Sequence, residues 1–151
     1  MSLDIPSTDT RLADPLSMAA ARLALDTALQ HAGRHGWRVS VAVLDAGGHL
    51  LAFGRSAGAP LHTIDLAQDK ALTAVSFALP TADVGKRLRD APEHVRQCLI
   101  LRPRLVPMGG ALPLQLGDRL VGAIGVSGAS EEQDCECASA GYDAITQHLH
   151  R

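Results

Sequence analysis

The pattern of apolar and polar residues predicts a chain in which helices cover a set of paired strands. An alanine-rich segment from residue 14 to about residue 35 begins with an Asp-Pro pair, which is typical of a helix start. Residues 37–44 alternate valine with small or polar residues and predict a strand. A glycine-containing turn at 45–48 joins it to a returning strand over 49–55, which makes an antiparallel hairpin.

A central helix of small residues is predicted after this hairpin, between Pro60 and Pro80. Apolar residues recur along it at helical spacing and define a side that faces the core: Ile64, Ala67, Ala71, Val75 and Ala78. Its polar residues are expected on the other faces. Because proline suits the first position of a helix, the backbone N–H groups after Pro60 are expected to point outward without intrahelical partners.

Three further helices are predicted in the second half of the chain. Two are short, at 81–90 and 92–101, and the last one runs from about 131 to 149. The spacing of Ser130 and Gln133 matches a capping box at the start of this last helix.

The remaining strands complete the predicted sheet. Residues 111–116 and 119–126 predict a second hairpin, and residues 104–107 are expected to add a fifth short strand. Tight turns between successive strands imply antiparallel pairing, and helices that cover such a sheet give an α+β domain. We therefore expect a flexible tail over 1–13 and a single domain over 14–151, with about five strands.

Composition narrows the classes of partner. The 151 residues are 46% hydrophobic but only 3% aromatic, so the core is expected to consist of aliphatic residues and alanine. The formal net charge of −2 is too close to zero to indicate nucleic acid or an anionic membrane as the main partner. We find no apolar run near the ~20 residues of a membrane span and no signal-peptide pattern at the N-terminus. We therefore expect neither nucleic acid nor membrane as a partner.

The cysteines indicate the compartment. There are three, Cys98, Cys135 and Cys137, and an odd count does not predict a disulfide framework. We infer a reducing, cytoplasmic setting. Cys98 is expected to face inward as a small apolar residue, and Cys137 is expected on the inner side of the last helix.

The start of the central helix has the highest concentration of side chains that can bind a metal ion or act in catalysis. His62 is the best candidate ligand, because imidazole binds iron or zinc well at neutral pH. Asp65, one turn further on, is a candidate second metal ligand or a group that orients the ring. If the chain is an enzyme, His62 is the candidate general base. The alternative is that His62 is an ordinary surface residue.

Five other positions allow both a binding role and a structural one. Lys70 is a candidate partner for a ligand carboxylate, or it pairs with Asp69 or with an acid of another subunit. Thr73 is a candidate ligand contact, or it bonds to its own preceding turn. Arg55 neutralises an anion or forms an ordinary salt bridge. Gly109 and Gly110 allow the backbone to approach either a ligand or an opposing helix closely.

A pair of histidines stands at the end of the first predicted helix. His31 and His35 are four residues apart, which is a metal-ligand spacing. Cationic and polar groups also suit the last turn of a helix, where the dipole is negative. We interpret the two histidines as last-turn residues and leave the metal pair as the alternative.

Four segments occur in a characteristic order: VAVLDAGGHLLAFGR, GAPLHTIDLAQDKALTA, PMGGALPLQLGDRLVGAIGVSG, and EEQD followed by CASAG. In these segments the chain resembles the GlcG/HbpS haem-binding family, over roughly residues 14–148. The same domain forms the C-terminal part of PduO-type corrinoid adenosyltransferases. The resemblance implies a profilin-like fold with a central antiparallel sheet, assembly as a homo-oligomer and binding of haem.

Three functional hypotheses follow. In the first, the chain binds haem, a related tetrapyrrole or another acidic small molecule between the central helix, the glycine segment and a neighbouring subunit, with His62 as nitrogen ligand and Arg55 and Lys70 facing the carboxylates. In the second, it is a small catabolic or biosynthetic enzyme that acts on an acidic metabolite through His62. In the third, it is a structural or assembly subunit without a ligand.

Overall fold

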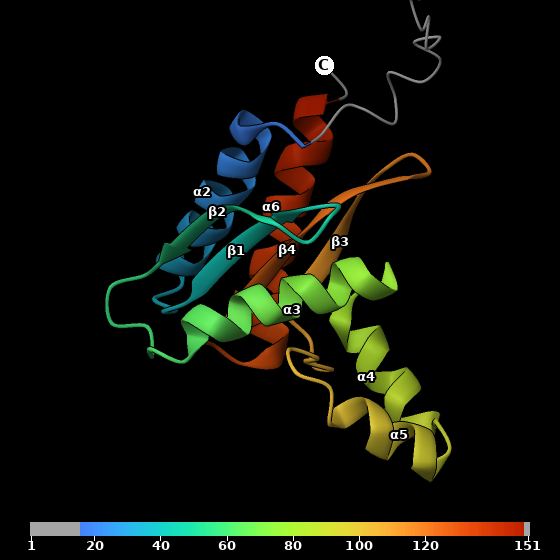
Figure 1. Ribbon diagram of the computed structural model, residues 1–151. Coiled ribbons are helices and arrows are strands. Elements are labelled where there is room, and N and C mark those ends of the chain that lie inside the picture. The colour runs from blue at the N-terminus through green and yellow to red at the C-terminus, as the bar shows by residue number, and fades with distance from the viewer. Residues whose placement is uncertain (1–15, 150–151) are drawn as a thin grey trace, which may run out of the picture.

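The computed structural model describes residues 16–149 of the chain (Figure 1). The elements in this range, in chain order, are α2 (Met18–Arg34), β1 (Ser40–Asp45), β2 (Leu50–Arg55), α3 (Thr63–Phe77), α4 (Thr81–Asp90), α5 (Glu93–Ile100), β3 (Ala111–Leu116), β4 (Arg119–Ser127) and α6 (Glu131–Leu149). The tail predicted over 1–13 and the Asp-Pro pair at 14–15 lie outside the described residues. The cap of α2 is Ser17, whose Oγ accepts the Ala20 N–H at 3.1 Å.

The sheet has four antiparallel strands in the order β2-β1-β4-β3, so the antiparallel prediction is confirmed and the expected number of about five was wrong. The predicted fifth strand, residues 104–107, forms an irregular segment instead. The Val106 N–H donates to the Thr73 hydroxyl at 3.0 Å instead of to a neighbouring strand. Pro103 and Pro107 have no N–H to donate. This segment therefore crosses α3 without joining the sheet.

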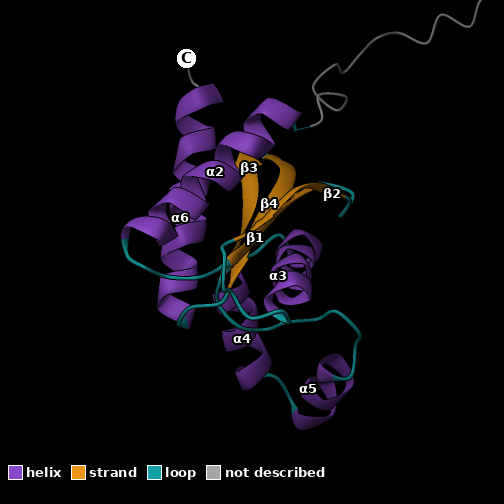
Figure 2. Cartoon of the chain, turned by 90° about the vertical axis from the view of Figure 1, so that its left-hand side faces the viewer, coloured by secondary structure: helices purple, strands orange, loops and turns teal. Residues whose placement is uncertain are grey.

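Helices cover both faces of the sheet. Figure 2 shows α2 and α6 on one side and α3 on the other. The larger core lies between the sheet and the pair α2 and α6, and a smaller core lies under α3. Both cores consist almost entirely of alanine, valine, leucine and isoleucine, as the composition predicted. Among the described helices, none has the length and apolar character needed to cross a membrane.

Helix α3 is buried over a wider surface than its apolar pattern predicted. Ala67, Ala71 and Val75 are buried as expected, whereas Ala78, also predicted to face the core, is the exposed C-cap residue of the helix. Lys70 and Thr73 on the predicted polar faces are buried as well. The reason is that α3 packs against β1, β3 and β4 on one side and is covered by the irregular crossing segment on the other.

The close approach of α3 to the sheet requires a glycine in β4. A Cβ atom on Gly125 would lie 2.2 Å from the Ala67 carbonyl oxygen and 2.8 Å from the Ala71 nitrogen. Any larger residue would therefore collide with the backbone of α3, which cannot move without disturbing the core on that face.

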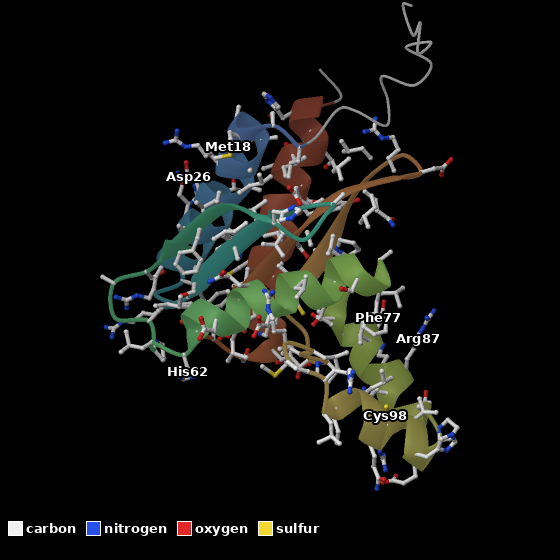
Figure 3. All side chains as sticks on the ribbon, viewed as in Figure 1. Met18, Asp26, His62, Phe77, Arg87 and Cys98 are labelled. Atoms are coloured by element: carbon white, nitrogen blue, oxygen red, sulfur yellow. The ribbon has the colours of Figure 1, made fainter. Side chains whose placement is uncertain are left out.

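Helices α4 and α5 project beyond the edge of the sheet (Figure 1). None of the residues of α5 is buried, and Cys98 is exposed (Figure 3). The prediction that Cys98 faces inward was therefore wrong, because α5 has no core to pack against. Cys137, in contrast, is fully buried in the core under α6, as predicted.

Two local predictions are confirmed by hydrogen bonds. In the turn between β1 and β2, the Asp45 carboxylate accepts the N–H groups of Gly47 and His49, both at 2.9 Å. At the start of α6, the Ser130 N–H donates to the Gln133 side chain at 3.1 Å and the Gln133 N–H donates to Ser130 Oγ at 3.2 Å. This is the reciprocal pattern of a capping box.

A substitution of Gly125 by alanine tests the contact between α3 and β4. We expect Gly125→Ala to lower the free energy of unfolding by about 3 kcal/mol, the upper end of the usual cost of overpacking a core. The matched control is Gly33→Ala in α2, where an added Cβ meets nothing within 4 Å. The control should leave stability unchanged or raise it by about 0.5–1 kcal/mol. Urea denaturation measures both, and equal stability of the two variants would contradict this packing.

Candidate functional site

A buried ion pair connects the helices that cover the two faces of the sheet. Lys70 on α3 and Asp134 in the first turn of α6 have side chains that are 1% and 3% exposed. The Lys70 ammonium group donates to Asp134 Oδ2 at 3.0 Å and to the Val126 carbonyl oxygen at 3.0 Å. The other carboxylate oxygen of Asp134 accepts the Ala129 N–H at 2.9 Å. The pair therefore connects α3, the end of β4 and the start of α6.

The electrostatics of the pair reflect its burial. Desolvation raises the pKa of Asp134, although the nearby Lys70 charge and the Ala129 N–H act in the opposite direction. Two ions removed from water are stable only when their hydrogen-bonding capacity is used, and here each partner has a second, backbone contact. Lys70 thus pairs with Asp134 of its own chain, and not with Asp69 or an acid of another subunit, the partners that the sequence suggested.

The glycine segment covers this pair. Gly110 has a φ of +132°, and a Cβ on it would lie 2.5 Å from the Val126 carbonyl oxygen and 2.7 Å from the Lys70 nitrogen. The Gly109 N–H donates to Glu131 Oε1 at 2.6 Å. Both glycines are buried and allow the backbone to approach α6, which is the packing role that the sequence offered as an alternative to ligand contact.

A cavity of about 240 Å³ opens beside the ion pair, between the start of α3, the loop after β4 and the first turn of α6. The following residues line it: Pro60, His62, Thr63, Leu66, Lys70, Met108, Ser127, Gly128, Ala129, Glu131 and Asp134. Two of the candidate residues, His62 and Lys70, therefore face one cavity.

Among the residues that line this cavity, His62 is exposed and has an imidazole ring, which is a good metal ligand. It occupies the N-cap position of α3 without making a side-chain capping bond (Figure 3). Its ring makes no hydrogen bond to any residue in the described range, in contrast to His31, His35 and His49. The imidazole ring of His62 is thus available to a ligand that enters the cavity.

The other candidate residues lie elsewhere. Arg55, exposed at the end of β2, donates to the Ala59 carbonyl oxygen at 2.9 Å. Asp65 lines a shallow depression with Gln68, Asp69 and Arg104, so the structure does not bring it into the cavity of His62.

Thr73 is tied to the protein backbone. Its hydroxyl lies 2.8 Å from the Asp69 carbonyl oxygen and accepts the Val106 N–H at 3.0 Å. The residue lines a separate depression of about 120 Å³ on the far part of α3. The bond to its own preceding turn is the structural alternative that the sequence allowed.

The acidic residues of the cavity were missed by the sequence analysis. Neither Asp134 nor Glu131 was among the candidate site residues. Asp134 is 64 residues from Lys70 in sequence, so no local spacing connects the two. A lysine on a predicted polar face gives no sign of burial, so the sequence offered no signal for a buried acidic partner.

The two thiols of α6 have raised pKa values. Burial raises the pKa of Cys135, and burial together with the Asp134 and Glu136 charges raises the pKa of Cys137 to about 12. Because the thiolate is the reactive form of cysteine, the raised pKa lowers the reactive fraction of both thiols at neutral pH.

Comparison with known proteins assigns the family. The chain belongs to the HbpS-like family, described as haem degrading protein HbpS-like, whose model matches residues 16–143. The protein GlcG of Escherichia coli K12 is 31% identical to it over 112 residues, which cover 74% of this chain and 81% of GlcG. The family suggested by the sequence motifs is confirmed.

Solved structures agree with this assignment. A double mutant of HbpS from Streptomyces reticuli is 34% identical, with a TM-score of 0.78 over 86% of this chain and 86% of HbpS. A complex of PduOC with heme is 28% identical, with a TM-score of 0.80 over 87% of this chain and 95% of PduOC. The α+β fold predicted from the sequence is therefore confirmed.

The buried pair is tested by removing its charges one at a time and together. We expect Lys70→Met to lower the free energy of unfolding by roughly 3–5 kcal/mol, because the Asp134 carboxylate is left buried without a cation. The double variant Lys70→Met/Asp134→Asn removes both charges, keeps an acceptor for the Ala129 N–H and should recover most of this loss.

The matched control for this experiment is the surface pair of Arg104 and Asp69, joined at 2.8 Å. Asp69→Asn should change stability by no more than about 1 kcal/mol. Urea denaturation of the variants gives the comparison. A Lys70→Met protein as stable as Asp69→Asn would show that the buried pair has no special role.

Proposed function

We propose that this chain binds haem or a closely related tetrapyrrole, and that the cavity beside the buried ion pair is the binding site. The observation that carries the proposal is the exposed His62 imidazole, which has no bond to the described residues and lines a cavity together with apolar Pro60, Leu66 and Met108. The likeness to a PduOC structure that holds heme supports it.

The chemistry of the cavity suits part of such a ligand. Imidazole nitrogen is a strong ligand for haem iron. Sites for small molecules usually have volumes of about 300–1,000 Å³, so a cavity of about 240 Å³ encloses only one part of a tetrapyrrole. When bound, haem would supply an iron centre capable of binding a further ligand and of redox change.

The rim of the cavity is apolar and exposed. Leu61, beside His62, is 74% exposed, and Met108 on the opposite side is 39% exposed. Exposed apolar groups at a binding site favour contact with an apolar macrocycle or with another protein surface. We propose that a second copy of the chain completes the site, so that the protein acts as a homo-oligomer.

Arg55 and Lys70 both keep unused N–H donors for the carboxylates of such a ligand. Arg55 uses one of its five N–H donors on Ala59, which leaves the others for an anion. Lys70 has three donors, of which two are used on Asp134 and Val126. We propose Arg55 as the main partner of a ligand carboxylate that extends beyond the cavity, because Arg55 is exposed and bonds to Ala59, the residue before Pro60 of the cavity lining, whereas Lys70 is already paired with Asp134.

A binding role is favoured over an enzymatic one by the surroundings of His62. A general base is normally oriented by a second polar group, and His62 has none within the described part of the chain. We propose the cytoplasm as its setting, because Cys98, Cys135 and Cys137 are all unpaired, as expected in a reducing compartment.

A hemin titration tests the proposal. Wild-type protein, freed of any bound pigment, should shift the Soret band of hemin and saturate at a fixed ratio. His62→Ala should weaken binding at least tenfold and change the position of the Soret band, because the iron loses its nitrogen ligand. The matched control, His94→Ala on exposed α5, should bind as the wild type does. The absence of a Soret shift, or equal spectra and affinities for the His62 and His94 variants, would refute the assignment of this site.

A further inference from the structure

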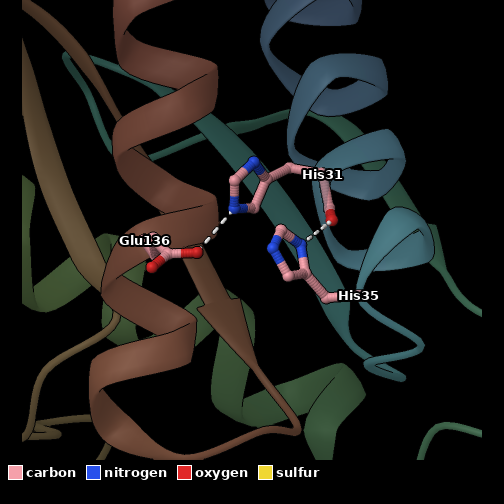
Figure 4. A group of neighbouring side chains, drawn as sticks. All are labelled: His31, His35 and Glu136. Carbon is pink, nitrogen blue, oxygen red and sulfur yellow. Dashed lines mark hydrogen bonds and ion pairs between the residues drawn. The ribbon is translucent and has the colours of Figure 1, made fainter.

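Two histidines and a glutamate meet on the surface between α2 and α6. His31 lies in the last turn of α2, His35 is the C-cap residue of the same helix, and Glu136 lies on α6, 105 residues after His31. One donor atom from each of the three side chains lies within 4.8 Å of the others. Figure 4 shows the two rings and the carboxylate turned toward one common point.

The hydrogen bond of the His35 ring determines which of its two nitrogens is free to bind a metal ion. His35 Nδ1 lies 2.9 Å from the backbone carbonyl oxygen of His31. A carbonyl oxygen only accepts, so Nδ1 carries the proton and Nε2 of the neutral ring keeps a free lone pair. A backbone carbonyl that fixes the tautomer in this way is a common outer partner of a metal-binding histidine.

His31 and Glu136 are already in contact. His31 Nε2 lies 2.7 Å from Glu136 Oε2. A metal ion would replace the proton that they share, since both groups bind metals in their deprotonated forms. The adjustment is small: tetrahedral ligands at about 2.0–2.1 Å from zinc lie about 3.4 Å apart.

The orientation of the group is supported by its surroundings. The His35 ring stacks on Trp37, with centroids 4.4 Å apart and an angle of 19° between the planes. The helices below it pack closely through buried Ala28, Ala32 and Ala138. The three donors therefore come from a rigid pair of helices, and only exposed side-chain torsions need to change.

We propose that His31, His35 and Glu136 form a binding site for a divalent transition-metal ion of the zinc class. Two imidazole nitrogens and one carboxylate are ligands typical of zinc, and three protein ligands leave one position open to water. Bound metal would connect α2 to α6 and stabilise the folded chain, because it binds the folded state selectively.

The site is separate from the cavity proposed for the tetrapyrrole. Asp134 and Glu136 are two residues apart on α6, a spacing that places them on opposite sides of the helix. The metal proposal therefore does not depend on the proposed function, and each can fail without the other.

Metal titration of the untagged full chain, stripped with EDTA, tests the proposal. Co²⁺ is added as a spectroscopic probe and then displaced with Zn²⁺. Binding of one ion per chain and a rise in melting temperature with Zn²⁺ are expected. His35→Ala and Glu136→Gln should each weaken binding at least tenfold and abolish the rise in melting temperature. Both residues are exposed, so melting temperatures in EDTA should stay close to that of the wild type.

Two control variants exclude other ligands. His94→Ala removes an exposed histidine far from the site, and Cys98→Ser removes the exposed thiol. Both should bind Co²⁺ and Zn²⁺ as the wild type does. Wild-type affinity in either His35→Ala or Glu136→Gln, or loss of binding in a control variant, would overturn the assignment of this three-ligand site.

Discussion

An ammonium group buried in a protein core must be compensated, and in this chain Lys70 is compensated by Asp134 and by the carbonyl of Val126. The three groups come from a helix on one face of the sheet, a helix on the other face and the strand between them. A shift of any of these elements would leave a desolvated charge without its partner, at a cost of several kcal/mol. The pair therefore fixes the register of α3 and α6 relative to the sheet.

The small residues of the chain make this arrangement possible. Gly125 allows the backbone of α3 to lie directly on β4, and Gly110 allows the backbone before β3 to cover the Lys70 nitrogen. Where the loop after β4 turns toward α6, the same arrangement leaves the cavity that His62 lines. The candidate site is thus a consequence of how the buried charge is covered, with the imidazole placed at its edge by the start of α3.

The elements of the fold were largely predictable because they depend on local patterns. The helical spacing in α3, the valine alternation in β1 and the capping box of Ser130 and Gln133 all act within a few residues. The predictions failed where distant residues decide the outcome. Residues 104–107 pair with the Thr73 hydroxyl instead of with a strand, and Cys98 has no core to face.

The site was predictable only in part for the same reason. His62 stood out because its residue type and its place at a helix start are visible in the sequence. The burial of Lys70 was not visible, since its position on the helix indicates a polar face and its partner Asp134 lies far along the chain. His31 and His35 showed a metal-ligand spacing, but the carboxylate that meets them comes from another helix. Which distant charges pair, and which metal-binding side chains meet, is decided only when the chain folds.

A crystal structure of the hemin-loaded protein would show whether the cavity beside the buried ion pair holds the ligand. We predict hemin density at the cavity between Pro60 and Ala129, with the iron bonded to a ring nitrogen of His62 and with the Lys70–Asp134 pair intact beneath it. Hemin bound elsewhere, for example at the outer surface of α2 and α6 or beside residues 102–105, would rule out this cavity as the binding site.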